Sequence, residues 1–217
     1  MHRPNPIRLV LLTILVMCAF AGNSLLTRAG VGSGAIDPAG FAMIRLASGV
    51  TMLAALVIWQ GRRVPLWGWT RVAGAISLAV YVIGFTLSAQ TVDAGLGALV
   101  LFGVVQISMF GWSICTGARP SWRQWTGAGV AFCGLVLVLS PGPEVNVDAP
   151  GLMLMTLGGL GWAAYSVAGR HATDPTAATA ANFLLALPIV ALALVQTQMT
   201  ITPHGALLAV ISGAFTS

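Results

Sequence analysis

The chain has 217 residues, of which 57% are hydrophobic and only 7% are charged. A soluble protein has about 25% charged residues, so this chain has too few charges to cover a water-facing surface of its own size. The composition excludes a soluble globule and predicts an all-α integral membrane protein, because lipid requires backbone groups to be satisfied within helices. The net charge of +5 comes from arginines spread in ones and twos, unlike the clusters that bind nucleic acid, so no nucleic-acid partner is expected.

Apolar stretches of about 20 residues, the length needed to cross a membrane, follow one another along the chain. Short connections separate them, and two stretches begin at the pairs Asp37-Pro38 and Asp174-Pro175. An Asp can cap the free amides at a helix start, and Pro fits the first helical position. The predicted spans of this polytopic bundle are 8–28, 38–59, 72–91, 95–116, 124–140, 151–169 and 177–196, and an eighth begins near residue 204.

The arginines predict the orientation of the bundle. If successive spans cross the membrane in alternating directions, eight of the ten arginines fall on one side of it. The loops on the other side hold the acidic residues, and the arginine found there is Arg28, at the end of a helix. Cytoplasmic loops carry the excess of arginine in membrane proteins, so the N-terminus is expected in the cytoplasm. The eight are Arg3, Arg8, Arg62, Arg63, Arg71, Arg119, Arg123 and Arg170; the acids of the other side are Asp37, Asp93, Glu144 and Asp148.

The sequence contains an internal repeat. The Asp-Pro start is followed by Arg45 in the first copy and by Asn182 in the second, and Gly22-Asn23 aligns with Gly161-Trp162. Because the repeat unit has five helices, the second copy would enter the membrane from the opposite side, as in many secondary transporters with inverted repeats. Residues 1–142 then form the first repeat and residues 150–217 the start of the second. The last helix is too short to cross, so a C-terminally truncated chain is expected.

Several stretches together resemble the drug/metabolite transporter superfamily, and within it the EamA-like exporters with ten helices. The stretches are FAMIRL at 41–46, GARPSWRQWTG at 117–127, GWAAYSVAG at 161–169 and SGAFTS at 212–217. The resemblance implies two inverted repeats around a central cavity and the export of small metabolites or amino acids. One departure is Ala118, because the family often has an acidic residue at this position.

Ionisable residues inside a span are costly and are candidates for function. Arg45 lies roughly 10 Å along its helix from Pro38; it either pairs with an anionic group of a solute or holds helices together through carbonyls or Asp37. The other candidates for the cavity are polar or aromatic, and for each of them interhelical packing is the alternative. The complete set is Asn23, Thr27, Arg45, Tyr81, Gln106, Trp162, Tyr165 and Asn182.

The residue pattern predicts neither an enzyme nor a cofactor or metal site. The three cysteines lie in apolar stretches without C-x-x-C spacing, and no G-x-S-x-G, H-E-x-x-H or Walker motif is present. No acid lies near the middle of a span, so facilitated or exchange transport is favoured over a proton relay.

The sequence therefore predicts a secondary transporter in the inner membrane, with the lipid bilayer and a small solute as its partners and no indicated oligomer. The localisation is suggested by the arginine-only basic usage and the abundance of Ala and Gly, which hint at a high-GC bacterium. The alternatives are a non-transporting membrane protein or inactive fragment and, less favoured, a membrane-embedded enzyme.

Overall fold

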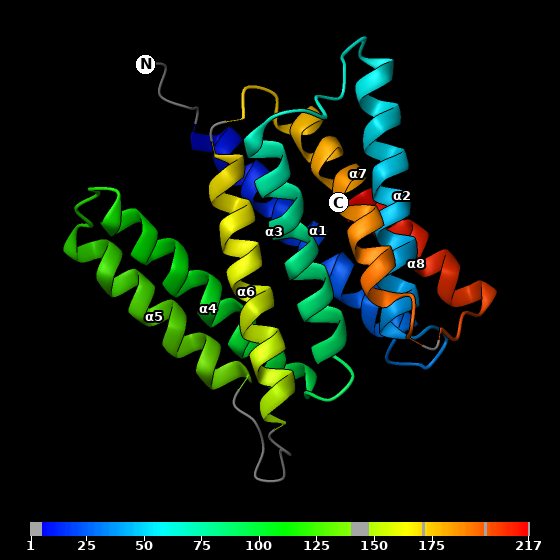
Figure 1. Cartoon of the computed structure of the whole chain (residues 1–217). Helices are drawn as coiled ribbons and strands as arrows, with labels where there is room; N and C mark the ends of the chain where they lie inside the picture. Colours follow the sequence, from blue (N-terminus) through cyan, green and yellow to red (C-terminus); the bar gives the residue numbers. More distant parts are fainter. Residues whose placement is uncertain (1–5, 140–147, 171, 198, 217) are drawn as a thin grey trace.

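The computed structural model describes residues 6–139, 148–170, 172–197 and 199–216, which form eight helices (Figure 1). Their bounds follow the predicted stretches closely. Arg3, Glu144 and the predicted repeat boundary at residue 142 lie outside the described residues. The helices are α1 Pro6–Gly30, α2 Pro38–Trp59, α3 Trp69–Ser88, α4 Ala94–Cys115, α5 Trp122–Leu139, α6 Ala149–Gly169, α7 Pro175–Leu194 and α8 Pro203–Thr216.

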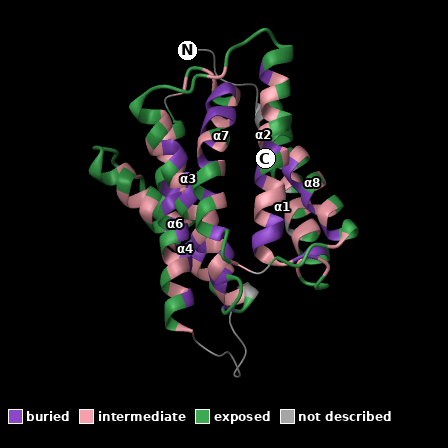
Figure 2. Ribbon diagram, turned by 45° about the vertical axis from the view of Figure 1, so that its right-hand side comes forward, coloured by how far each residue is buried: buried purple, intermediate pink, exposed green. Residues whose placement is uncertain are grey.

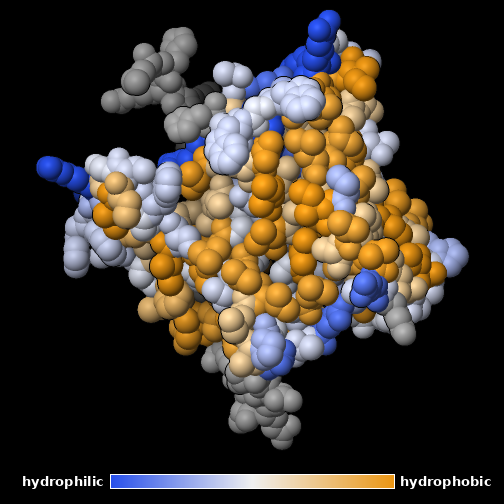
Figure 3. All heavy atoms as spheres, in the orientation of Figure 1, coloured by the Kyte–Doolittle hydropathy of each residue, from blue (hydrophilic) through white to orange (hydrophobic). Residues whose placement is uncertain are grey.

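Six of the described helices, α1 to α4, α6 and α7, are long and apolar enough to cross a membrane. The chain is therefore an all-helical, multi-pass membrane protein. The helix α5, which was predicted as a further span, is not among the six: it has 18 residues and begins with the polar run Trp122-Arg123-Gln124. Figure 3 shows the hydrophobic side chains as a broad band across the visible face, with hydrophilic side chains mostly at its ends.

Successive helices run in opposite directions, so loops alternate between the two ends of the bundle (Figure 1). The start of α1, the end of α2, the start of α3 and the turn between α4 and α5 share one end with the end of α6. These segments carry the arginines grouped by the sequence, and this end of the bundle is called the arginine end below. The described arginines there are Arg8, Arg62, Arg63, Arg71, Arg119, Arg123 and Arg170.

The helices pack as two groups joined by α7. In one group α6 lies between α3 and α4, and α5 packs mainly against α4. In the other α8 lies against both α1 and α2. The helix α7 contacts α2 and α3, and the largest buried cluster forms where these three meet, around Leu46, Leu78 and Val190. Figure 2 shows the buried residues concentrated where the helices face one another.

Glycines bring the backbones of α3 and α6 into direct contact. A Cβ atom added to Gly84 would lie 2.5 Å from the Leu154 carbonyl oxygen, and one added to Gly161 would lie 2.7 Å from the Ser77 carbonyl oxygen and 2.8 Å from the Tyr81 amide nitrogen. Small residues let membrane helices approach this closely. Van der Waals contacts between the helices then stabilise the pair, because the hydrophobic effect does not drive helices together within lipid. The α3 and α6 pair is therefore a rigid seam.

Asp37 caps α2 and also ties it to the loop before α8. Its Oδ1 accepts from the amides of Ala39 (2.8 Å) and Gly40 (2.9 Å), which would otherwise lack a partner at the helix start. Its Oδ2 accepts from the Thr200 amide at 2.8 Å, and its own amide donates to the Thr200 carbonyl at 3.0 Å. One carboxylate thus satisfies a helix start and joins two loops that are far apart in the sequence.

Asp174 has the equivalent role at the arginine end. It accepts from the Ala177 amide at the start of α7 and from Arg62 Nη1 (3.1 Å), just beyond the end of α2. The pKa of the Asp174 carboxyl lies below its usual value, chiefly because the Ala177 amide donates to it; desolvation opposes this effect and the Arg62 guanidinium adds to it. The α2 and α7 pair is consequently linked at both of its ends.

Replacement of Asp37 by Ala is expected to lower the free energy of unfolding by about 1 kcal/mol or more, because a helix cap and the link to Thr200 are lost together. Asp93→Ala is the matched control: Asp93 also caps its helix, through Gly95 and Leu96, but it is exposed, and its carboxylate bonds to no other element in the described part of the chain. Thermal unfolding in detergent micelles should show the larger loss for Asp37→Ala, and equal losses would contradict the role of Asp37 as a link.

Insertion of a methyl group at the α3 and α6 seam should also destabilise the fold. Gly161→Ala would force the two backbones apart, at a cost of about 1–3 kcal/mol for overpacking. Gly22, its repeat partner in the sequence alignment, has no atom within 4 Å of an added Cβ, so Gly22→Ala should be neutral or stabilising. A melting temperature of Gly161→Ala no lower than that of Gly22→Ala would show that the seam is not tight.

Candidate solute site

Arg45 lies in α2 without a charged partner. It is the eighth residue of the helix and is half-buried, and no hydrogen bond or ion pair of its guanidinium is found among the described residues. The predicted alternative of a pair with Asp37 is not formed, since the Asp37 carboxylate is bound to backbone amides. The guanidinium does lie within electrostatic reach of Tyr81 on α3. A positive charge inside an apolar helix is therefore left available for an anionic group.

Aromatic side chains gather beside this charge on α3 and α6. The ring centroids of Tyr81 and Trp162 are 4.6 Å apart at 62°, an edge-on contact that aromatic quadrupoles favour. Tyr165 lies 6.1 Å from Trp162, and Phe85 lies 6.0 Å from Tyr81. The four residues are called the aromatic cluster below. Phe85 was not among the predicted residues, although its spacing of four from Tyr81 places it on the same face of the helix.

Asn23 and Thr27 lie elsewhere, on α1, and Asn23 joins this helix to α8. The Ser212 hydroxyl donates to Asn23 Oδ1 at 2.7 Å, and the Thr27 hydroxyl donates within α1 to the Asn23 carbonyl at 2.9 Å. Ser212 is fully buried and was not among the predicted residues. The contact of Asn23 with Ser212 fits the interhelical alternative, in which polar side chains hold membrane helices together.

Gln106 and Asn182 have separate positions. Gln106 Nε2 donates to the Ala128 carbonyl at 3.0 Å and so holds α4 to α5. Asn182 is 4% exposed in α7, faces Gly74 of α3, and its Oδ1 has no hydrogen-bond partner in the described part of the chain. The structure therefore groups Arg45 with Tyr81, Trp162 and Tyr165, and leaves the other four candidates outside this group.

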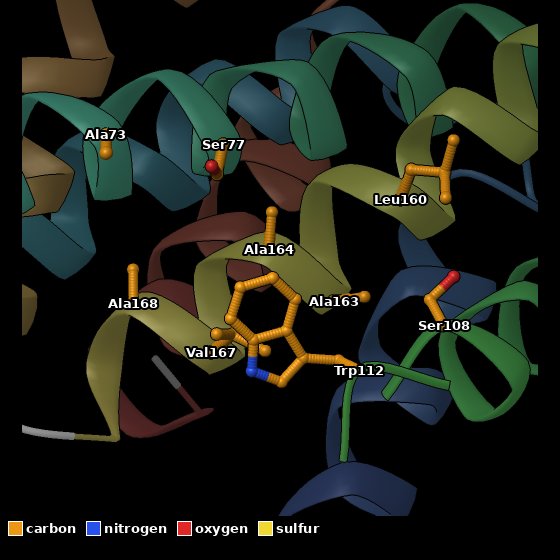
Figure 4. Close-up of a pocket in the computed structure, with 9 residues that line it drawn as sticks. All are labelled: Ala73, Ser77, Ser108, Trp112, Leu160, Ala163, Ala164, Val167 and Ala168. Carbon is orange, nitrogen blue, oxygen red and sulfur yellow. The ribbon is translucent and has the colours of Figure 1, made fainter. Parts of the chain in front are cut away.

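A groove of about 380 Å³ lies between α3, α4 and α6 (Figure 4). None of the eight predicted residues lines it. On α6 the lining includes Leu160, Ala164 and Val167, which share one helix face; Trp162 is two residues from Leu160 and Ala164 and lies about 200° away around the helix. The groove and Trp162 are thus on opposite sides of α6, whereas Tyr81 shares a face of α3 with the lining residues Ala73 and Ser77. The lining residues are Ala73, Ser77, Ser108, Trp112, Leu160, Ala163, Ala164, Val167 and Ala168.

The groove leaves one weak signal in the sequence. Trp112 lies near the end of the apolar stretch of α4, and it is 50% exposed. Alanines repeated along α6 indicate a helix face with small side chains, but alanine is common throughout this chain. The groove itself arises from the spacing between helices, which the sequence pattern does not contain.

The chain is similar to proteins of two bacteria and to a solved structure. No family model matches it. A solved crystal structure has a similar fold, with a TM-score of 0.74 and 20% identity over 94% of this chain and 76% of that chain. The uncharacterized transporter YwfM of Bacillus subtilis is 24% identical over 202 residues, which are 89% of this chain and 68% of that protein.

The uncharacterized protein PA1977 of Pseudomonas aeruginosa is more similar. The two are 41% identical over 213 residues, which are 97% of this chain and 73% of that protein. Identity at this level over nearly the whole chain requires a shared fold and descent. The chain therefore belongs to the same family as PA1977 of Pseudomonas aeruginosa.

Proposed function

We propose that this chain is a secondary transporter of the EamA-like, drug/metabolite class, which exports a small metabolite or amino-acid-like solute across the inner membrane by alternating access. The similarity to YwfM, a protein named as a transporter, supports the class. The arginines gathered at one end support a cytoplasmic position for that end and for the N-terminus.

The packing of the helices supports the inverted repeats that alternating access requires. The proposed repeats pair α1 with α6, α2 with α7 and α3 with α8. When each helix is replaced by its counterpart, the contact between α1 and α8 becomes the contact between α6 and α3. The contact of α2 with α8 likewise becomes that of α7 with α3. All four contacts are present, and paired helices run in opposite directions (Figure 1). On this proposal residues 1–142 form the first repeat and the second begins at residue 150.

Individual contacts follow the same exchange. Asp37 links the start of α2 to the loop after α7, and Asp174 links the start of α7 to the loop after α2. Gly213 of α8 packs directly on the Arg45 carbonyl, and Gly74 of α3 packs on Asn182. Arg45 and Asn182, the repeat partners in the sequence, thus occupy comparable positions, but only one carries a charge.

The observation that carries the solute class is the unpaired guanidinium of Arg45 beside the aromatic cluster. A carboxylate on the solute would form the charge-assisted hydrogen bonds that Arg45 lacks, while Tyr81 and Trp162 would contact its apolar part. In this role the charge selects the solute, and the aromatic wall fixes its position next to the charge.

The test is counterflow uptake into proteoliposomes, which does not depend on the direction of transport. The full chain is reconstituted, loaded with an unlabelled panel of neutral amino acids and small monocarboxylates, and assayed for uptake of each labelled compound. Arg45→Ala should reduce uptake about tenfold or more, because a hydrogen bond to a charged group is worth about 1.5–3 kcal/mol. Arg45→Lys should keep part of the uptake, and Trp162→Ala should also lower it.

Gln106→Ala serves as the control variant, since Gln106 joins α4 to α5 away from Arg45. Its uptake should match that of the parent chain, even where its melting temperature falls. Equal uptake by the parent and Arg45→Ala would refute the solute site. A parent chain that exchanges no compound of the panel would contradict transport and favour a non-transporting membrane protein.

The described carboxylates predict that transport is not driven by a proton gradient. Asp37, Asp93, Asp148 and Asp174 all cap helices at the ends of the bundle, so in the described part of the chain no acid is placed to relay protons through a span. An imposed pH gradient should therefore drive no accumulation of the labelled solute in proteoliposomes that hold no unlabelled solute. Accumulation that a protonophore abolishes would show that transport is coupled to protons.

A further inference from the structure

The groove between α3, α4 and α6 opens to the bilayer. Val72, Ile76 and Val80 follow one another at intervals of four on α3, next to the lining residues Ala73 and Ser77, and are 43%, 50% and 38% exposed. Apolar side chains left exposed on a membrane helix face lipid. The groove is therefore a lateral site, distinct from the solute site on the other side of α6.

Its shape comes from the divergence of α4 from α6. The two helices touch along the first half of α4, where Gly159 packs against Val104 and the Leu101 carbonyl, and Gly97 against Met155. Beyond that half they separate toward the arginine end (Figure 1). Figure 4 shows the Trp112 indole beside α6, with Ser77 and Ser108 on the other two helices. The groove is thus widest at its charged end.

The lining is suited to a hydrocarbon chain. Four of the lining residues are alanines, whose short side chains leave the hollow, and none carries a charge. Trp112 is half exposed and presents an aromatic wall inside the bilayer. A volume of about 380 Å³ at membrane depth would not stay empty, because the surrounding lipid tails can enter it.

Positive charge lies at the arginine end of the groove. Arg170 follows α6 seven residues after the lining residue Ala163, which places it close to the groove face of that helix; Arg71 lies in the first turn of α3 at the same end of the bundle, about 200° around that helix from the lining residue Ala73. Neither guanidinium has a hydrogen-bond or ion-pair partner in the described ranges, where the ion pair found is that of Arg62 with Asp174. Unpaired arginines at the end of an apolar groove complement an anionic head group.

The start of α3 adds to this positive field. The helices α2, α4, α6 and α7 begin at an Asp that accepts from their first amides. The helix α3 begins at Gly68 without a side-chain cap, so its first amides carry the partial positive charge of the helix dipole without a neighbouring carboxylate.

We propose that this groove binds an anionic phospholipid, with an acyl chain along α6 and the phosphate at Arg170, assisted by Arg71. The chain replaces free lipid in the hollow, and the phosphate supplies the acceptor that the two arginines lack. This site is independent of the proposed transport, and its test measures binding alone.

The test is native mass spectrometry of the purified full chain, equilibrated with equal amounts of phosphatidylglycerol and phosphatidylcholine that have the same acyl chains. The parent should retain phosphatidylglycerol preferentially. Arg170→Gln should lower its retention about fivefold, and Arg170→Gln with Arg71→Gln about thirtyfold, since each arginine near a lipid surface contributes about 1 kcal/mol. Retention of phosphatidylcholine should stay the same in these variants.

A larger side chain in the groove should lower the retention of both lipids. Ala164→Leu places extra bulk in the hollow and should lower the retention of each lipid, and the smaller Ala164→Val should do so in part if the larger change harms folding. Ala47→Leu, at an exposed position of α2, and Arg28→Gln, at the opposite end of the bundle, are the matched controls. Both should retain lipid as the parent does, with melting temperatures compared throughout.

Three results would overturn the proposal. The parent could retain the two lipids equally, which would remove the role of the head group. Arg170→Gln could behave as Arg28→Gln does, which would show that any arginine on the surface attracts anionic lipid. The folded variants Ala164→Leu and Ala164→Val could retain both lipids fully, which would leave the groove to another occupant.

Discussion

The need to satisfy every backbone amide and carbonyl within lipid governs this structure. It makes each crossing segment a helix and moves the unsatisfied groups to the helix ends. There the described acidic residues are used as caps, and three of them also bind a residue of another segment: Asp37 binds Thr200, Asp148 binds Thr91 and Asp174 binds Arg62. Asp37 and Asp174 therefore start their helices and also hold α2 against α7, around which the other helices are arranged.

Packing inside the bundle relies on small residues, because lipid tails are as apolar as the side chains they compete with. The seam of α3 and α6 illustrates this: Gly84 and Gly161 let two backbones touch, and the seam then separates two different environments. On one side lie the aromatic cluster and Arg45. On the other lies the groove that faces the bilayer. The same pair of helices thus contributes residues both to the proposed solute site and to the groove.

Two kinds of unpaired arginine result from this arrangement. Arg45 is held inside a span, where an unpaired charge is costly and a solute carboxylate would relieve it. Arg170 and Arg71 lie at the bundle end, where they orient the chain and meet lipid head groups. The surroundings of each guanidinium, and not its chemistry, separate the two proposed roles.

The sequence by itself determined the eight helices and the caps of α2 and α7 by Asp37 and Asp174, because local apolar length and capping chemistry decide these features. It also singled out Arg45, Tyr81, Trp162 and Tyr165, since charge and aromatic bulk inside spans are visible without a fold. Only the tertiary structure decided that Tyr81, Trp162 and Tyr165 gather within electrostatic reach of Arg45, while Asn23 and Gln106 serve as interhelical contacts. It alone contains the groove, because divergence between α4 and α6 depends on the packing of three helices and leaves no periodic mark in the chain.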